Sequence, residues 1–172
     1  MAVQTISKSA TTLRVGILSV TYTANEIFRH AYTIAQKRGL ETGDISRDKE
    51  VLTSAFHTWL ATQTLQALEM EILDPRETLI EKWTWTFNYA DKPDAENTSP
   101  IGKLEDALGK IKPLAAGCRV RFFVRLAPGA PAVKGWGNAV PANDAHLVRV
   151  DVGEILTQKI TTLVGCMIQK PE

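Results

Sequence analysis

The chain has 172 residues, of which 44% are hydrophobic, and its 20 lysines and arginines nearly balance 19 aspartates and glutamates. This length is typical of one domain whose core is large enough to need no disulfide or metal support. The balanced charge does not favour direct binding to nucleic acid or to a membrane surface, because both generally require a basic excess.

The N-terminal region changes character after its first residues. Residues 1–13 are expected to form an N-terminal tail or an edge strand, since Val3-Gln4-Thr5-Ile6-Ser7 alternates apolar and polar side chains. From about Val15 to Arg38, apolar residues recur at intervals of three and four, which predicts a helix. A second helix is expected to begin with Ser46 as its cap and to run to about Thr62.

Leu65 to Tyr89 predicts an antiparallel hairpin. Apolar and polar residues alternate on both sides of Asp74-Pro75-Arg76-Glu77, which favours a turn. Large aromatic side chains share one face of the outgoing strand, at Trp83, Trp85, Phe87 and Tyr89. This face is expected to form the core under the helices, whereas Glu69 and Glu71 on the opposite face are expected to be solvated.

The second half of the chain predicts one more helix and three more strands. Ser99 and Pro100 are typical of a helix start, and Pro113 is expected to end that helix near Ile111. Cys118 to Leu126 alternates and predicts a strand. The two final strands are expected at residues 146–152 and 158–168, after the proline- and glycine-rich connection 127–145.

These elements predict an α+β domain over residues 1–172, with three helices packed on one face of a mainly antiparallel sheet. The chain contains no HExxH, GxSxG or P-loop sequence, and its three histidines share no ligand spacing with cysteine or carboxylate. We therefore expect no catalysis, no metal and no cofactor. Two cysteines outside any CxxC pair, and a start without signal-peptide order, predict a reduced protein in the cytoplasm.

The order of motifs resembles HORMA domains. TANEIFRHAYTIAQKRGL resembles their first helix, and TWLATQTLQALEMEILDPRETLIEKWTWTFNY resembles their helix-to-hairpin segment. IGKLEDALGKI is similar to their central helix. RVRFFVRLAPGAPAVKGWG is similar to the strand, Pro-Gly break and Gly-Trp turn of the bacterial branch. The resemblance covers roughly Leu13 to Val152 and rests on the order and spacing of the segments together.

The resemblance implies a peptide clamp without catalysis of its own. In HORMA domains a C-terminal safety belt encircles a short closure peptide, and an AAA+ ATPase reverses closure by pulling on the N-terminal part. Bacterial members accompany cyclic-oligonucleotide synthases of the CD-NTase type in CBASS anti-phage operons, where the closed form binds and activates the synthase. The implied partners are therefore a CD-NTase, a closure peptide or second HORMA protein, and an AAA+ ATPase, with no membrane.

The resemblance also suggests site residues. The receiving strand and the tryptophan after it are the expected peptide-binding site, namely Arg119, Val120, Arg121, Phe122, Phe123, Val124, Arg125 and Trp136. Residues 127–172 are the candidate safety belt. Val3, Gln4, Thr5 and Ile6 are a candidate closure peptide, or a candidate tail on which the AAA+ ATPase pulls. The alternative interpretation is an ordinary edge strand or a frayed tail.

Two other functions stay open. One is a small α+β enzyme that uses Arg119, Arg121 or Arg125 to bind an anionic substrate, which requires a concave pocket around these residues. The other is a protein–protein interaction module that never switches, in which residues 127–172 form a static loop and a terminal hairpin.

Overall fold

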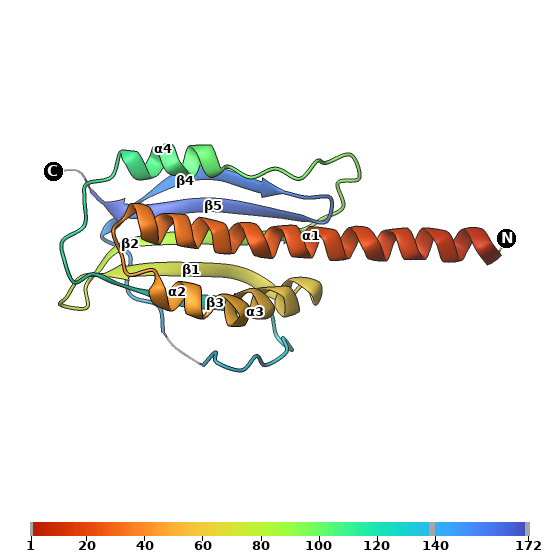
Figure 1. Ribbon diagram of the computed structural model, residues 1–172, viewed down its shortest axis with the longest axis horizontal. Helices are drawn as coiled ribbons and strands as arrows, with labels where there is room; N and C mark the ends of the chain where they lie inside the picture. Colours follow the sequence, from red (N-terminus) through yellow and green to blue (C-terminus); the bar gives the residue numbers. More distant parts are fainter. Residues whose placement is uncertain (1, 138–139, 171–172) are drawn as a thin grey trace.

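The computed structural model describes residues 2–137 and 140–170, with side chains from residue 14 onward. In these ranges the elements are α1 (Ala2–Lys37), α2 (Gly43–Arg47), α3 (Lys49–Ala61), β1 (Leu65–Leu73), β2 (Leu79–Tyr89), α4 (Ile101–Gly109), β3 (Arg119–Leu126), β4 (Leu147–Leu156) and β5 (Ile160–Gln169). The strands form one five-stranded antiparallel sheet in the order β3-β1-β2-β5-β4. The helices cover one face of this sheet, which confirms the predicted α+β architecture (Figure 1).

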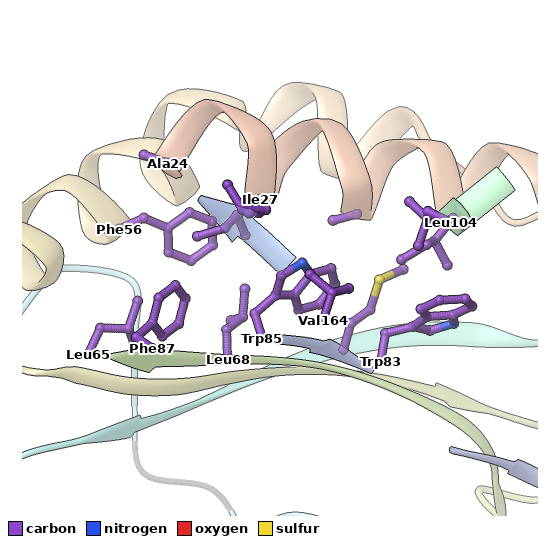
Figure 2. Packing of buried hydrophobic residues seen from close by; sticks show 14 of the residues in the cluster. Ala24, Ile27, Phe56, Leu65, Leu68, Trp83, Trp85, Phe87, Leu104 and Val164 are labelled. Atoms are coloured by element: carbon purple, nitrogen blue, oxygen red, sulfur yellow. The ribbon is translucent and has the colours of Figure 1, made fainter. Parts of the chain in front are cut away.

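The predicted hairpin is the centre of the sheet. β1 and β2 pair so that Leu68 lies opposite Trp85 and Met70 lies opposite Trp83. Both tryptophans are fully buried under the helices. Figure 2 shows their rings facing Ile27 of α1 and Leu104 of α4, together with other core side chains. The aromatic face of the hairpin therefore forms the core, as its alternation predicts.

The N-terminal region differs from the expected edge strand or tail, because Ala2–Lys37 is one continuous helix. The five-residue alternation competes in the sequence with a longer pattern at intervals of three and four, which runs through Val3, Ile6, Ala10, Leu13, Ile17 and Val20. A pattern of this period favours a helix over a strand. The N-terminal part of α1 extends well beyond the sheet (Figure 1).

The expected second helix is divided. α2 ends at Arg47 and α3 begins at Lys49, so Ser46 lies inside α2 and caps neither helix. Asp48 precedes α3 without a side-chain cap, because its carboxylate accepts a hydrogen bond from Arg47 Nε at 3.1 Å instead. The division adds one short helix to the three that were predicted.

Ser99 also has a different role from the predicted helix cap. No side chain caps α4, and Ser99 Oγ lies 2.8 Å from Nε2 of the fully buried His30. The other ring nitrogen, Nδ1, accepts a hydrogen bond from Trp85 Nε1 at 3.3 Å. A buried imidazole needs partners at both nitrogens, and this requirement takes precedence over an exposed cap.

A second buried polar cluster joins α1 to the sheet. Arg38, at the end of α1, donates from Nε and Nη2 to Glu81 Oε2 at 3.0 and 2.7 Å. Trp83 Nε1 donates to the other oxygen of Glu81 at 2.6 Å. All three residues are buried, so this hydrogen-bonded cluster fixes α1 on β2.

Among the described helices, none combines the length and apolar character needed to cross a membrane.

Candidate functional site

β3 lies at the edge of the sheet. It pairs with β1 on one side, and no strand in the described ranges pairs with its other side. An unpaired strand edge presents main-chain N–H and C=O groups that can bind an extended peptide. The strand predicted to receive a peptide is thus one of the two edge strands, β3 and β4.

The side chains of β3 alternate between the two faces as predicted. Val120 and Phe122 lie opposite Ile72 and Met70 of β1 and pack against the core on the helix side. Arg121 faces the opposite side, where its guanidinium lies 4.9 Å from the centre of the Phe123 ring. A peptide along β3 would therefore meet an apolar wall on one face and arginines on the other.

The connection from β3 to β4 first follows α3. Ala127 N donates to the Thr64 carbonyl at 2.8 Å, and Trp59 Nε1 donates to the Pro131 carbonyl at 2.8 Å. Trp136, expected in the peptide site, packs edge-on against Trp59 with 5.3 Å between ring centres, and lies 6.3 Å from Phe56. These contacts make Trp136 an anchor of the connection on α3.

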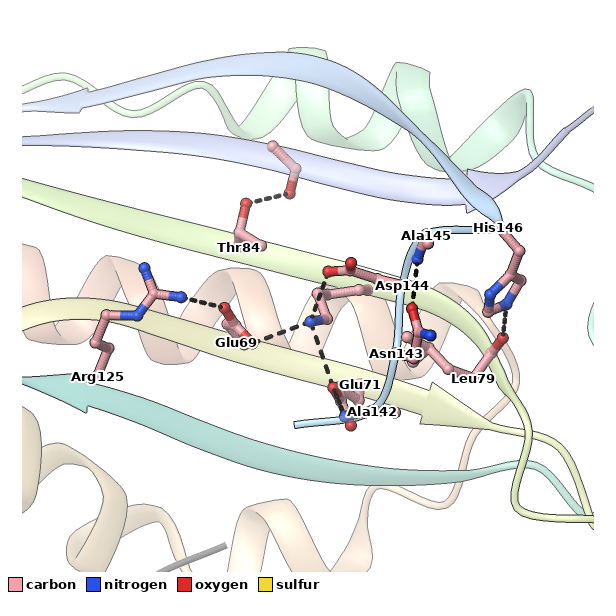
Figure 3. Close-up of polar contacts among 12 residues, drawn as sticks. Glu69, Glu71, Leu79, Thr84, Arg125, Ala142, Asn143, Asp144, Ala145 and His146 are labelled. Carbon is pink, nitrogen blue, oxygen red and sulfur yellow. Dashed lines mark hydrogen bonds and ion pairs between the residues drawn. The ribbon is translucent and has the colours of Figure 1, made fainter. Parts of the chain in front are cut away.

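The connection then reaches the opposite face of the sheet (Figure 3). Ala142 N donates to Glu71 Oε1 at 3.0 Å, and Lys82 Nζ donates to Asp144 Oδ2 at 3.0 Å. His146 Nε2 donates to the Leu79 carbonyl at 2.7 Å. Residues 142–146 are therefore held across β1 and β2, on the face away from the helices.

Ion pairs beneath residues 142–146 were not expected from the sequence. Lys82 is 3% exposed and its Nζ lies 3.1 Å from Glu69 and 3.4 Å from Glu71, while Arg121 Nε contacts Glu71 at 2.8 Å. Burial lowers the pKa of Lys82, but the hydrogen bonds that Lys82 donates to Asp144 and Glu69 outweigh this effect and raise the pKa above its ordinary value. The prediction that Glu69 and Glu71 are solvated was wrong, because the connection covers them.

The described parts of the connection flank β3 on the two faces of the sheet. Residues 127–136 lie on the helix side, and residues 142–146 lie on the other side. An extended segment paired with the free edge of β3 would lie between these two parts. β3 can hold such a segment by main-chain hydrogen bonds.

A cleft opens on the helix side of β3. Its volume is about 400 Å³, and it lies between β3 and the region of α2 and α3. Its apolar lining comes from Leu40, Ile45, Leu52, Val120 and Phe122. Its charged lining includes Glu41, Asp44, Arg47 and Asp48.

The arginines of β3 are already paired with glutamates. Arg121 contacts Glu71 at 2.8 Å and Arg125 contacts Glu69 at 3.5 Å, both on the sheet face away from the helices. Arg119 donates to Glu77, and this hydrogen bond raises the pKa of the Arg119 guanidinium. Because their charges are paired, the arginines lend no support to an anionic-substrate pocket.

In the described part of the chain, no group of three or more histidine, cysteine, aspartate or glutamate side chains is arranged to hold a metal.

The sequence predicted the strand β3 but not the contacts that hold the connection after it. Lys82 and Asp144 are 62 positions apart, and no local pattern relates them. One sequence signal could have indicated that Lys82 is buried. Lys82 lies on the same face of the predicted hairpin as Glu69 and Glu71, two carboxylates that can pair with its ammonium group. A buried lysine requires paired carboxylates, so this combination was the available clue.

Comparisons with known proteins agree with this geometry. A chain of the mitotic checkpoint complex superposes with a TM-score of 0.78 at 12% identity, over 89% of this chain and 99% of that chain. C. elegans HTP-1 bound to the HIM-3 closure motif gives 0.71 at 10% identity, over 87% and 89%. A chain of the E. coli MS115-1 CdnC:HORMA-deltaN complex gives 0.62 at 11% identity, over 88% and 88%. No curated protein sequence matches the chain.

At these identities the solved structures establish the fold alone. The family assignment comes from the sequence, since the profile described as Bacterial HORMA domain 2 matches residues 8–167. That match spans the helices, the hairpin, β3 and the connection described above. The chain belongs to the bacterial HORMA domain 2 family.

Proposed function

We propose that this chain is a cytoplasmic regulatory protein of a bacterial CBASS anti-phage system, and that it acts by binding peptides rather than by catalysis. It binds a closure peptide, or a sister HORMA protein that presents one, and it controls a CD-NTase. The observation that carries the proposal is that residues 127–136 and 142–146 lie on opposite faces of the sheet beside the free edge of β3. Family membership and the solved HORMA complex with CdnC support it.

The peptide site in this proposal is the edge of β3 from Arg119 to Arg125. The peptide adds a strand through main-chain hydrogen bonds, and its side chains alternate between the cleft and the arginine face. Residues 127–172 act as the safety belt. Trp136 fastens the belt on α3, and Asp144 fastens it on Lys82.

Release requires the belt to leave one of its two attachments. The Asp144 carboxylate is 42% exposed, whereas Trp59 beneath Trp136 is fully buried. The attachment on the sheet face is therefore the one that opens first, because water can replace its contacts. An AAA+ ATPase drives this opening by pulling on the N-terminal part of α1, which extends away from the sheet (Figure 1).

Val3, Gln4, Thr5 and Ile6 have a second proposed role, as a closure peptide offered to a sister HORMA protein. These residues are helical here, so the role requires the first turns of α1 to unwind. Short terminal segments of a helix unwind at low cost. Deleting residues 1–12 and measuring affinity for the sister protein tests this role, and unchanged affinity would rule it out.

The proposed function is tested by capture from the native host. The full-length tagged protein should recover a CD-NTase-type nucleotidyltransferase, identified by mass spectrometry. Asp144→Lys should recover less, because a second ammonium beside Lys82 repels the belt. The control is Asp94→Lys, which makes the same charge change at an exposed loop residue.

Recovery by the wild type and Asp94→Lys, with loss in Asp144→Lys, supports a clamp that must be fastened to act. Absence of any nucleotidyltransferase from the wild-type capture contradicts regulation of a CD-NTase. Equal recovery by all three proteins contradicts the role of the belt. Thermal unfolding of each variant confirms that the fold is retained.

A further inference from the structure

We propose that the peptide bound on β3 carries a bulky apolar residue and, two positions away, a lysine or arginine. This inference rests on the proposed function and specifies the ligand of the same site. It follows from the shape and charge of the cleft on the helix side of β3, which has a volume of about 400 Å³.

The alternation of a strand determines which peptide side chains reach the cleft. Every second residue of a peptide paired with β3 points to the helix side, where Val120 and Phe122 also point. These two side chains and Leu52 form part of the cleft lining. An apolar peptide side chain entering here would remove apolar surface from water on both partners, which favours binding.

The rim of the cleft is acidic. Glu41, Asp44 and Asp48 contribute three carboxylates, and Arg47 contributes one guanidinium that contacts Asp44 at 3.0 Å and Asp48 at 3.1 Å. One positive charge against three negative charges leaves a net charge of −2 on this rim. Arg119 also lines the cleft, but its guanidinium is paired with Glu77.

The next peptide residue on the helix side lies two positions from the apolar one. Successive side chains on one face of a strand are about 7 Å apart, so this residue reaches from the apolar floor toward the rim. A lysine or arginine has the length and charge to contact the carboxylates there. An aspartate or glutamate at the same position would be repelled.

The other face of β3 makes no comparable selection. Its four cations, Arg119, Arg121, Arg125 and Lys82, are matched by four carboxylates, Glu69, Glu71, Glu77 and Asp144. Peptide side chains on this face therefore meet a balanced surface. Charge selection acts from the helix side alone. The basic side chain of the peptide must therefore point to the same side as the apolar one, which places it two positions away.

The test selects ligands from displayed random ten-residue peptides, using the full-length protein. Enriched peptides should contain an apolar residue and a lysine or arginine separated by one position. The strongest peptide is then synthesised, with two variants that change its apolar residue to serine or its basic residue to glutamate. Each variant should bind the wild-type protein about tenfold more weakly, or worse.

Charge reversal in the protein provides the matched comparison. The double substitution Glu41→Lys/Asp44→Lys alters two exposed rim residues. It should lower the affinity for the selected peptide about tenfold and raise the affinity for the glutamate variant of that peptide. Asp94→Lys/Glu96→Lys reverses two exposed charges in a distant loop and should change neither affinity. This exchange of preference would not arise from a loss of folding.

The outcomes separate the inference from the proposed function. Enriched peptides without the apolar and basic pair, or equal affinities for the two protein variants, overturn the inference and leave peptide binding intact. Failure to enrich any peptide on the wild-type protein contradicts peptide binding itself and removes the basis of the inference.

Discussion

The two tryptophans at positions 85 and 136 have different surroundings and should have different roles. Trp85 is fully buried in the core and bonded to His30, whereas Trp136 is half-buried and packs on the surface of α3. The first therefore supports the fold. The second supports the position of the belt, so its loss should affect function more than stability.

Trp85→Ala should lower the free energy of unfolding by about 3–5 kcal/mol, the usual cost of a large aromatic deletion in a core. Trp136→Ala should lower it by about 1 kcal/mol, because it removes the ring contacts that a half-buried side chain makes on the surface of α3. Urea unfolding measures both values. Trp136→Ala should also lower the affinity for the selected peptide. Equal losses of unfolding free energy in the two variants would contradict this division of roles.

His30 should make stability depend on pH. Burial lowers its pKa from 6.5 to about 4. Between these values the unfolded chain binds a proton that the folded chain does not, so stability is full above pH 6.5 and falls as the pH drops toward 4. From pH 7 to pH 5 this one group should lower the free energy of unfolding by about 2 kcal/mol.

The pH dependence can be isolated by substitution. His30→Gln lacks the titrating group, so its free energy of unfolding should fall less steeply than that of the wild type between pH 7 and pH 5. His57→Gln, at a half-buried position on α3, is the control and should keep the wild-type slope. If His30→Gln keeps the wild-type slope, another group causes the dependence.

At the scale of elements, local patterns predicted the hairpin well and the belt poorly. The alternation of Trp83 and Trp85 with threonines determined which face of β2 is buried, because one pleated strand has only two faces. The buried state of Glu71 depends on Ala142, from a connection with no periodicity of its own. A contact between two such segments has no local signature in the sequence.

The N-terminal helix shows a different limit. Five alternating residues at Val3–Ser7 suggested a strand, although the intervals of three and four extend from Val3 to Ile34. The longer pattern was the correct guide, as α1 demonstrates. The strand β3 itself was predicted from its strict alternation, and its place at an edge of the sheet is consistent with the breaker-rich segment directly after it.

The attachment of the belt to the sheet should depend on Asp144. Asp144→Asn removes the charge beside Lys82 but keeps the size of the side chain, so segment 140–146 should detach more often. Proteinase K should then cleave this segment severalfold faster. Because the Asp144 side chain is 42% exposed, the free energy of unfolding should fall by less than about 1 kcal/mol. Cleavage no faster than in the control variant Asp94→Asn would contradict attachment of the belt through Asp144.

At the scale of the whole molecule, the fold separates a rigid half from a half that can move. α1, α3, α4, the hairpin, β4 and β5 share one buried core, whereas residues 127–146 of the belt are held by an aromatic anchor on one face and ion pairs on the other. The free edge of β3 lies between these two attachments. In the proposed function, this arrangement would let one domain retain a peptide without unfolding its core.

The most direct test of the clamp is backbone hydrogen exchange with and without the strongest selected peptide. Amides of β3, residues 119–126, and of residues 140–146 in the belt should exchange more slowly when the peptide is bound. Amides of β4, the other edge strand of the sheet, should be unchanged. Protection at β4 instead of β3, or no protection at either edge, would contradict a peptide held on β3 under the belt.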